Sequence, residues 1–283
     1  MWIGGTDVIH HKKITPLRIL GALIAAAVVF AILMPYIWML LTSFKTTPEI
    51  MKNPDKILPI NWVLSGYKKV LTRSPFFQWF GNSVVVACSA TLLVLLTSSL
   101  AGYVFAKYRF PGKDLLFWLI LASMMVPFTV IMIPNFLIVN ALGLYNSLAA
   151  LIVPVMVSGF GIYLCRNFCE DIPDSVCEAA KIDGAGDFYI YLTIILPLLR
   201  PCLASLAIFT FLDSWNDYLR PLIMLEKVNN MTLPVALSFF TSQHGSDLSA
   251  TMAAASLVML PVTIVFLAFQ KQFIKGIALT GTK

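Results

Sequence analysis

The stretch CEAAKIDGAGDFYIYLTIILPLLRP, from Cys177 to Pro201, is a short polar segment that leads back into apolar sequence. Upstream of it, Asp171 can cap a helix that has Pro173 in its first turn, where proline is tolerated. We predict that this helix ends at Ile182, because Gly184 supplies the left-handed backbone conformation of a helix stop. The segment is therefore predicted to form a short helix and a sharp turn before the chain returns to an apolar helix.

This short helix has two possible roles. A helix of about three turns is marginal alone in water, so it must pack on something. Ala179 and Ala180 leave its surface shallow and Glu178 adds a negative charge, which is typical of a docking helix for a cytoplasmic partner. Alternatively, it forms a helical hairpin with a second helix, capped by Asp187, on its own bundle. Glu178 would then point to solvent or pair with Lys181, three residues further on.

The composition of the whole chain indicates a membrane protein. Of its 283 residues, 59% are hydrophobic and 12% are charged, and the mean hydropathy is +0.84; soluble domains carry about twice that charged fraction. We predict an all-α integral membrane fold of one domain, residues 17–270, between cytoplasmic tails at 1–16 and 271–283. Its six transmembrane helices cover about 17–41, 79–106, 115–139, 147–166, 202–225 and 250–270.

Basic residues predict the orientation of these helices. With both termini inside, twelve of the twenty Lys and Arg residues fall on the inner side, as the positive-inside rule favours. The segment that contains Cys177 is then also cytoplasmic. Prolines at 127, 134, 154 and 261 interrupt several spans. Because proline removes a helix hydrogen bond, together they fit a bundle that changes shape.

A polar cluster lies in the fifth span at Asp213, Trp215, Asn216 and Asp217. Charges at such depth usually face a cavity or a partner. Trp215 could stack on a sugar ring while Asn216 bonds its hydroxyls, in which case these residues belong to a substrate pathway. The alternative is an interfacial aromatic anchor beside a structural ion pair. Asp217 is then the easier partner for Arg220, about one turn away.

Other chemistry has little support in the sequence. The five cysteines are an odd number in or near apolar helices, which favours buried small hydrophobic residues over disulfides or a metal site. No phosphate-binding GxxxxGK[ST] loop, HExxH or GxSxG motif occurs. We therefore expect a chain that is not an enzyme by itself and that holds no cofactor or metal.

The quoted stretch resembles the EAA motif of permease subunits of binding-protein-dependent ABC importers. The matching residues are Glu178-Ala179-Ala180, Asp183-Gly184-Ala185, Ile194, Leu196 and Pro197. Further resemblance to the sugar-importer branch, and to the smaller permease of maltose and oligosaccharide importers, extends along the chain. It is carried by Asn82-Ser83, AGYVFAKYRFPGKD, LGLYNS, WND and the tail FIKGIALTGTK.

The resemblance implies a function and a set of partners. The EAA segment, about 171–197, would carry the coupling helix, with ATPase contacts at Glu178, Ala179, Ala180, Asp183 and Gly184. The chain would form half of a sugar pathway in a bacterial or archaeal plasma membrane. Its partners would be a second homologous permease, two cytoplasmic ATPase subunits that bind ATP and Mg, and an extracytoplasmic sugar-binding protein, with no role for nucleic acid. The alternative is a stand-alone secondary transporter or channel, which would need an ion or pore site within the spans, with Asp213 as the main candidate.

Overall fold

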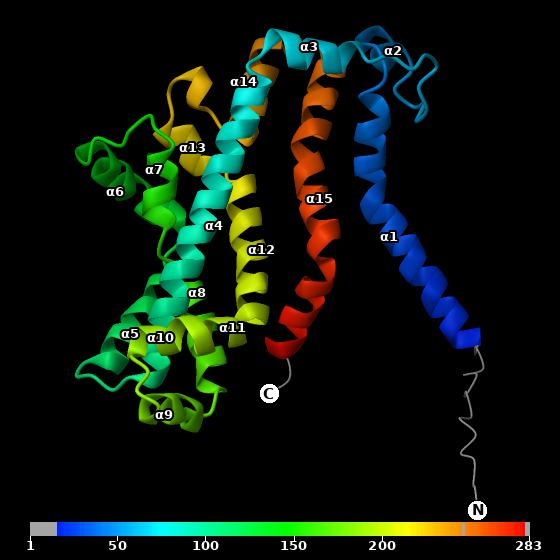
Figure 1. Cartoon of the computed structure of the whole chain (residues 1–283). Helices are drawn as coiled ribbons and strands as arrows, with labels where there is room; N and C mark the ends of the chain where they lie inside the picture. Colours follow the sequence, from blue (N-terminus) through cyan, green and yellow to red (C-terminus); the bar gives the residue numbers. More distant parts are fainter. Residues whose placement is uncertain (1–15, 245–246, 281–283) are drawn as a thin grey trace, which may run out of the picture.

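In the computed structural model of the chain, the described residues 16–244 and 247–280 form helices joined by turns and loops, and they include no strand. Figure 1 shows an upright bundle with short helices at both ends. Three helices are long and apolar enough to cross a membrane by themselves. They are α1 (Pro16–Thr42), α4 (Phe76–Lys107) and α15 (Leu248–Thr280).

The other apolar segments are bent pairs, so six spans result only if each pair counts as one. The bends measure 104° in the first pair, 42° in the second and 76° in the third. The pairs are α5 (Lys113–Ser123) with α6 (Phe128–Ala141); α7 (Ala149–Ile152) and η1 (Val153–Val155) with α8 (Gly159–Glu170); and α10 (Asp187–Ile190), η2 (Tyr191–Ile195) and α11 (Leu196–Leu198) with α12 (Arg200–Asn216).

The bends correct three predicted spans, of which 147–166 is divided by the 42° bend between η1 and α8. The segment 115–139 was predicted to be one span, but the chain turns sharply between α5 and α6, just before Pro127, because a residue that precedes proline disfavours helical geometry. The segment 202–225 is also interrupted, since α12 ends at Asn216 and α13 (Leu219–Met224) follows. By contrast, Pro134 and Pro261 lie inside continuous helices.

The centre of the bundle is the tight crossing of α4 and α8. A Cβ atom added to Gly102 would lie 2.5 Å from Cβ of Cys165, and one added to Gly161 would lie 2.2 Å from Oγ of Ser98. Small residues on both helices therefore bring the two backbones together, as is common where membrane helices pack closely. This crossing fixes the ends of α4 and α8 relative to each other.

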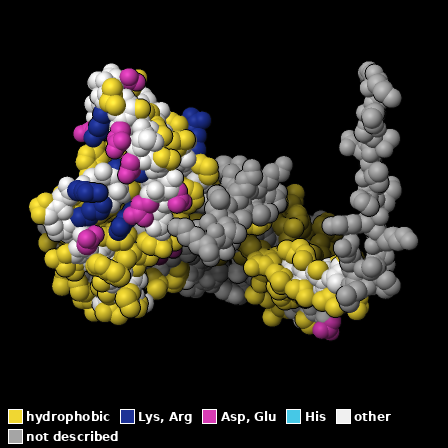
Figure 2. Space-filling view, turned by 90° about the horizontal axis from the view of Figure 1, so that it is seen from below, with side chains coloured by type: hydrophobic (Ala, Val, Ile, Leu, Met, Phe, Trp, Pro, Cys, Tyr) yellow, Lys and Arg dark blue, Asp and Glu magenta, His cyan; other side chains and the backbone are white. Residues whose placement is uncertain are grey.

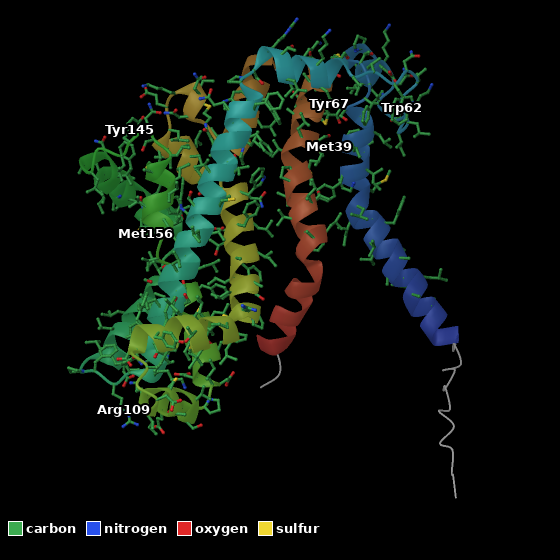
Figure 3. The ribbon with its side chains drawn as sticks, in the orientation of Figure 1. Met39, Trp62, Tyr67, Arg109, Tyr145 and Met156 are labelled. Carbon is green, nitrogen blue, oxygen red and sulfur yellow. The ribbon has the colours of Figure 1, made fainter. Side chains whose placement is uncertain are left out.

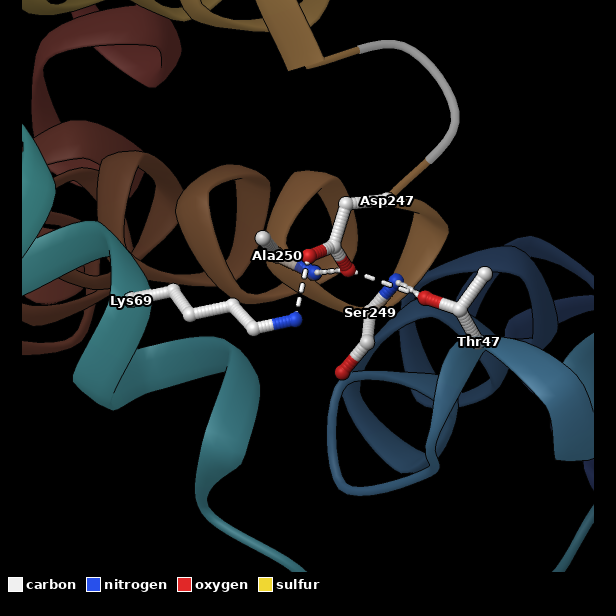
Figure 4. A network of polar contacts seen from close by, with 5 residues as sticks. All are labelled: Thr47, Lys69, Asp247, Ser249 and Ala250. Atoms are coloured by element: carbon white, nitrogen blue, oxygen red, sulfur yellow. Dashed lines mark hydrogen bonds and ion pairs between the residues drawn. The ribbon is translucent and has the colours of Figure 1, made fainter.

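A polar network joins the helices at the opposite end of the bundle from α9 (Asp174–Ile182) (Figure 4). The carboxylate of Asp247 accepts hydrogen bonds from Lys69 at 2.5 Å, from Thr47 at 2.9 Å and from the backbone N–H of Ala250 at 3.2 Å. Thr47 in turn accepts from the N–H of Ser249. The start of α15 is thereby tied to two short helices, α2 (Thr47–Lys52) and α3 (Ser65–Arg73).

The lower part of helix α1 diverges from the other helices, whereas its upper part lies beside α15 (Figure 1). None of its apolar window is buried, and side chains such as Leu23 and Phe30 are more than 60% exposed. A bilayer can solvate such a surface. The remaining short elements, η3 (Val228–Asn230) and α14 (Leu233–His244), pack beside α4 at the end of the bundle that carries α3.

Candidate functional site

Helix α9 lies at the lower end of the bundle in Figure 1, the end at which α1 starts and α15 ends. It ends at Ile182 as predicted, and Gly184 has φ +82° as its role in the turn requires. The predicted start is wrong, because Asp171 closes α8 while Pro173 precedes α9. The backbone of α8 continues to Glu170, which leaves Asp171 no free helix start to cap.

The face of α9 that points away from the bundle carries most of the EAA residues. Glu178, Ala179, Asp183 and Gly184 are exposed, whereas Ala180 is half-buried against the core. Of the two outcomes predicted for Glu178, exposure to solvent is the one observed, and no ion pair of Glu178 with Lys181 or another cation occurs within the described residues. This outer face is therefore open.

The inner side of α9 is held by a few contacts. Lys181 forms an ion pair with Asp187 at 2.9 Å, and this hydrogen bond raises the pKa of Lys181. Cys177 is buried, which raises the pKa of its thiol and keeps it protonated at neutral pH. An ion pair thus stabilises the turn after α9, and the helix itself packs on the core through Cys177.

One ion pair connects α9 to the end of α4, and a cluster of tyrosine rings connects the end of α4 to η2. Lys107 forms an ion pair with Asp174 at 2.6 Å, and its hydrogen bond to this carboxylate holds the pKa of Asp174 below its usual range. Beside this pair, the ring of Tyr103 contacts that of Tyr108 edge-on at 5.4 Å and stacks on that of Tyr191 at 5.7 Å. The ion pair thus links α9 to α4, and the stacked rings link α4 to the π-helical turn η2.

A cavity of about 1130 Å³ lies higher in the bundle, between α4, α8 and α12. Three interruptions of the helices border it: the start of α6 at Phe128, the link between η1 and α8, and the break after Asn216. Its lining comprises Ala90, Val94, Phe128, Pro154, Val155, Val157, Ser158, Phe160, Phe209, Thr210, Leu212, Asp213, Ser214, Asn216, Asp217, Tyr218, Leu219 and Arg220. Irregular backbone at membrane depth is tolerated where it lines such a space.

Side chains satisfy the backbone at one of these interruptions. Thr97 on α4 donates a hydrogen bond to the carbonyl oxygen of Met156 at 2.7 Å, and Oγ of Ser158 accepts from the N–H of Gly161 at 3.1 Å. Figure 3 shows Met156 at about half the height of the bundle. The break between η1 and α8 is thus built into the fold at the level of the cavity.

One cation and two carboxylates form the charged part of the lining. The guanidinium of Arg220 lies 3.0 Å from Asp217 and 3.9 Å from Asp213, and it sits over the ring of Phe128 at 4.7 Å. The predicted ion pair between Asp217 and Arg220 is confirmed. Asn216 also lines the cavity, with its amide donating back to the carbonyl of Leu212.

Trp215 does not belong to this lining. Its side chain is 1% exposed and lies in the core, where it stacks on Phe211 at 5.7 Å and meets Phe80 edge-on at 5.9 Å. The rotation of α12 that turns Asn216 toward the cavity turns Trp215 away from it. The indole therefore lies in the core in this structure and does not face the cavity.

Sequence reasoning missed the contribution of Phe128, Pro154 and Ser158 to the cavity. The signal was present, since prolines at 127 and 154 mark both breaks. The sequence could not show that both breaks lie next to α12 in the folded chain. Among the cysteines, four are buried as expected and Cys88 is exposed. Sγ of Cys165 lies 3.9 Å from Sγ of Cys202, a contact of small core side chains.

Interrupted apolar helices around a polar cavity are the architecture of a membrane transport protein. The family model described as binding-protein-dependent transport system inner membrane component matches residues 95–279, and the chain belongs to this family. It is thus a multi-pass permease component of such a transport system in the plasma membrane, and its relatives are transport rather than catalytic subunits.

Two relatives and one solved structure illustrate the likeness. The arabinooligosaccharides transport system permease protein AraQ of Halalkalibacterium halodurans is 33% identical over 91% of this chain and 94% of its own length. The diacetylchitobiose uptake system permease protein NgcG of Streptomyces coelicolor is 33% identical over 89% and 84%. The fold resembles a chain in the crystal structure of a bacterial ABC transporter involved in alginate import, with a TM-score of 0.82, 24% identity and coverage of 93% and 98%.

Proposed function

We propose that this chain is the permease subunit of an ATP-driven importer for a sugar or oligosaccharide. It would form half of the translocation pathway beside a second, related permease, and would work with two ATPase subunits and an extracytoplasmic sugar-binding protein. The observation that carries the proposal is the exposed face of α9, which presents the EAA residues at one end of the bundle. The carbohydrate class is supported by the names of the relatives.

In this proposal α9 is the coupling helix. Glu178, Ala179, Asp183 and Gly184 lie on its open face, while Ala180 contributes from its half-buried edge. Ile182 is 87% exposed at the end of the helix. Such an exposed apolar side chain, beside the small alanine side chains, fits a concave surface on a partner protein. Burial of Ile182 in that surface would remove apolar area from water.

Movement of α9 would reach the spans through the contacts at the end of α4. The ion pair between Lys107 and Asp174 would pull on α4, and the stacked tyrosines would push on η2. Ser99 and Tyr191 share a buried hydrogen bond of 2.7 Å, so α4 and η2 would move together. The bends next to η1 and α12 would take up the change as a rigid-body rearrangement.

The substrate would pass along the cavity beside α12. Asn216 and Asp217 would supply hydrogen-bonding groups for hydroxyls, together with Asp213 and Arg220. ATP and Mg would be bound by the partner ATPase. A stand-alone secondary transporter remains a weaker alternative, because the membership in a binding-protein-dependent family favours an assembly and the cavity cation is already matched by Asp217.

The proposal is tested by replacing Gly184 with valine in the complex purified from its native membrane and reconstituted in vesicles. A β-branched residue at φ +82° is strained, while no heavy atom lies within 4 Å of the added Cβ, so the damage is confined to the turn after α9. The matched control is Gly186→Ala, which also has open space but has φ −72°.

We expect Gly184→Val to insert normally and to lose ATP-dependent sugar uptake, and Gly186→Ala to retain it. Normal uptake by Gly184→Val would overturn the coupling role of α9. A chain that purifies without any ATPase, even after cross-linking, would overturn the importer as a whole and favour the secondary transporter.

A further inference from the structure

A second cavity, of about 400 Å³, lies at the α9 end of the molecule, outside the proposed pathway. It is enclosed by the loop after α4, the first turn of α5 and the side chain of Arg166 from α8. Its lining residues are Arg109, Phe110, Gly112, Lys113, Asp114, Leu115 and Arg166. We call it the basic cavity.

Three cations and one carboxylate face this space. Arg166 is partly engaged, since Nε lies 2.8 Å from Glu170 and its guanidinium sits over the ring of Phe117 at 3.8 Å. The ammonium of Lys113 donates to the carbonyl oxygen of Tyr108 at 3.0 Å. Arg109 makes no ion pair or hydrogen bond within the part of the chain that the structure describes. Figure 3 places it at the same end of the bundle as α9.

The positive charge of the basic cavity is therefore incompletely compensated. Asp114 is its one acidic lining residue, and it belongs to the first turn of α5, where a carboxylate favourably meets the free backbone N–H groups. Glu170 balances Arg166, while Asp174 pairs with Lys107 and attracts Arg109 only weakly, without an ion-pair contact. An anion held between Arg109 and Lys113 would complete this balance.

On one side, the basic cavity adjoins a row of exposed apolar side chains along α5. Leu115 is 66% exposed, and Trp118 and Leu119 follow on the next turn at 68% and 58%. Figure 2, seen from this end, shows charged side chains gathered on part of the face and hydrophobic side chains along its border. A ligand that fits both features has an anionic head and apolar chains.

We propose that the basic cavity binds the phosphate of an anionic phospholipid, with the acyl chains along the exposed face of α5. Arginine and lysine at the membrane surface attract such headgroups, and an exposed tryptophan at that depth is typical of the interface. Free phosphate carries the same kind of charge, but it has no apolar part that could contact Leu115 and Trp118. The bound lipid would fix the α5 end of the molecule next to α9.

The test measures lipid binding to the full-length chain, purified with the subunits that accompany it, then delipidated and titrated. Native mass spectrometry counts bound phosphatidylglycerol, with phosphatidylcholine as the neutral comparison. The double variant Arg109→Gln, Lys113→Gln removes the two freer cations of the cavity. The matched control, Lys68→Gln with Arg73→Gln, removes the same charge from exposed positions on α3 at the other end of the bundle.

We expect one tight phosphatidylglycerol site per chain, weakened about tenfold or more in the cavity variant and unchanged in the control. Phosphatidylcholine should not fill it, and millimolar inorganic phosphate should not displace the lipid. Equal losses in both variants, or unchanged binding in the cavity variant, would overturn the proposal. Displacement by inorganic phosphate alone would show a free-anion site in place of a lipid site.

Discussion

The α9 segment and the cavity beside α12 place their polar side chains in opposite ways. On α9, Glu178 and Asp183 point outward, and Glu178 has no ion-pair partner among the residues described. Along the cavity, Asp217 faces Arg220 at 3.0 Å, so the cation and this carboxylate balance each other. The first arrangement offers charge to a protein partner, and the second offers hydrogen bonds beside a cation that is already paired with Asp217.

The two regions also differ in how they are held. Helix α9 is held by the side chains of Cys177 and Ala180 and by ion pairs at its ends, whereas the cavity is walled by segments of α4, α8 and α12 within the bundle. Damage to α9 should therefore affect coupling alone. Damage to the cavity should affect transport while leaving the association with an ATPase intact, and each prediction below tests this separation.

The largest effect is expected from Arg220→Met, which leaves Asp213 and Asp217 at the cavity without their cation. Breaking a buried ion pair on one side costs about 3 kcal/mol or more, and the side chain of Arg220 is 24% exposed, so we expect roughly 2 kcal/mol. That cost falls on the free energy of unfolding, and we expect sugar uptake to fall as well, because the two carboxylates at the cavity lose their cation. Reconstituted sugar uptake measures it, with ATPase co-purification as the second readout.

Two further variants serve as controls for Arg220→Met. Arg220→Lys keeps the charge and should retain most of the uptake. The double variant Arg220→Met, Asp217→Asn removes both partners and should be more stable than Arg220→Met alone, because no unpaired carboxylate is left at position 217. Loss of the ATPase from Arg220→Met would contradict the separation of the two regions.

A smaller effect is expected from Ile182→Ser at the end of α9. Because the side chain is 87% exposed, the free energy of unfolding should change by less than about 0.5 kcal/mol. Binding of the ATPase should weaken about tenfold, since an apolar contact that is desolvated in the complex is lost. Co-purification at graded ATPase concentration measures the change. The control is Val176→Ser, a less exposed apolar residue of the same helix, and equal effects of both would argue against a specific role of Ile182.

The local features of α9 could be predicted from the sequence because they depend on neighbouring residues. The pair Asp183-Gly184 fixes where the helix stops, since only the glycine adopts φ +82° without strain. The start at Asp174 could not be fixed in this way. Asp171 and Pro173 are both plausible starts by local rules, and the length of α8 decides between them.

The cavity was less accessible to sequence reasoning because it depends on packing. The prolines at 127 and 154 mark possible bends, but so do those at 134 and 261, and only tertiary contacts decide which helices break. Trp215 shows the same limit. A helix rotation that differs by one residue exchanges Trp215 and Asn216, and no strong amphipathic pattern along α12 sets that rotation in advance.

The smallest effect, and the most local, is expected at the contact between α4 and α9. Lys107→Met removes the ion pair with Asp174, so amide hydrogen exchange across α9 should accelerate while exchange across α12 stays unchanged. The same contact predicts a pH dependence. Because the pKa of Asp174 is lowered in the folded chain, its contribution is present above the ordinary carboxyl pKa of about 4 and is lost as the pH falls through the lower folded value. Relative to the intrinsic amide exchange rate at each pH, the protection of α9 should therefore fall on acidification in the wild type and much less in Lys107→Met. Lower protection of α12 in the variant would show that the two regions are not separable.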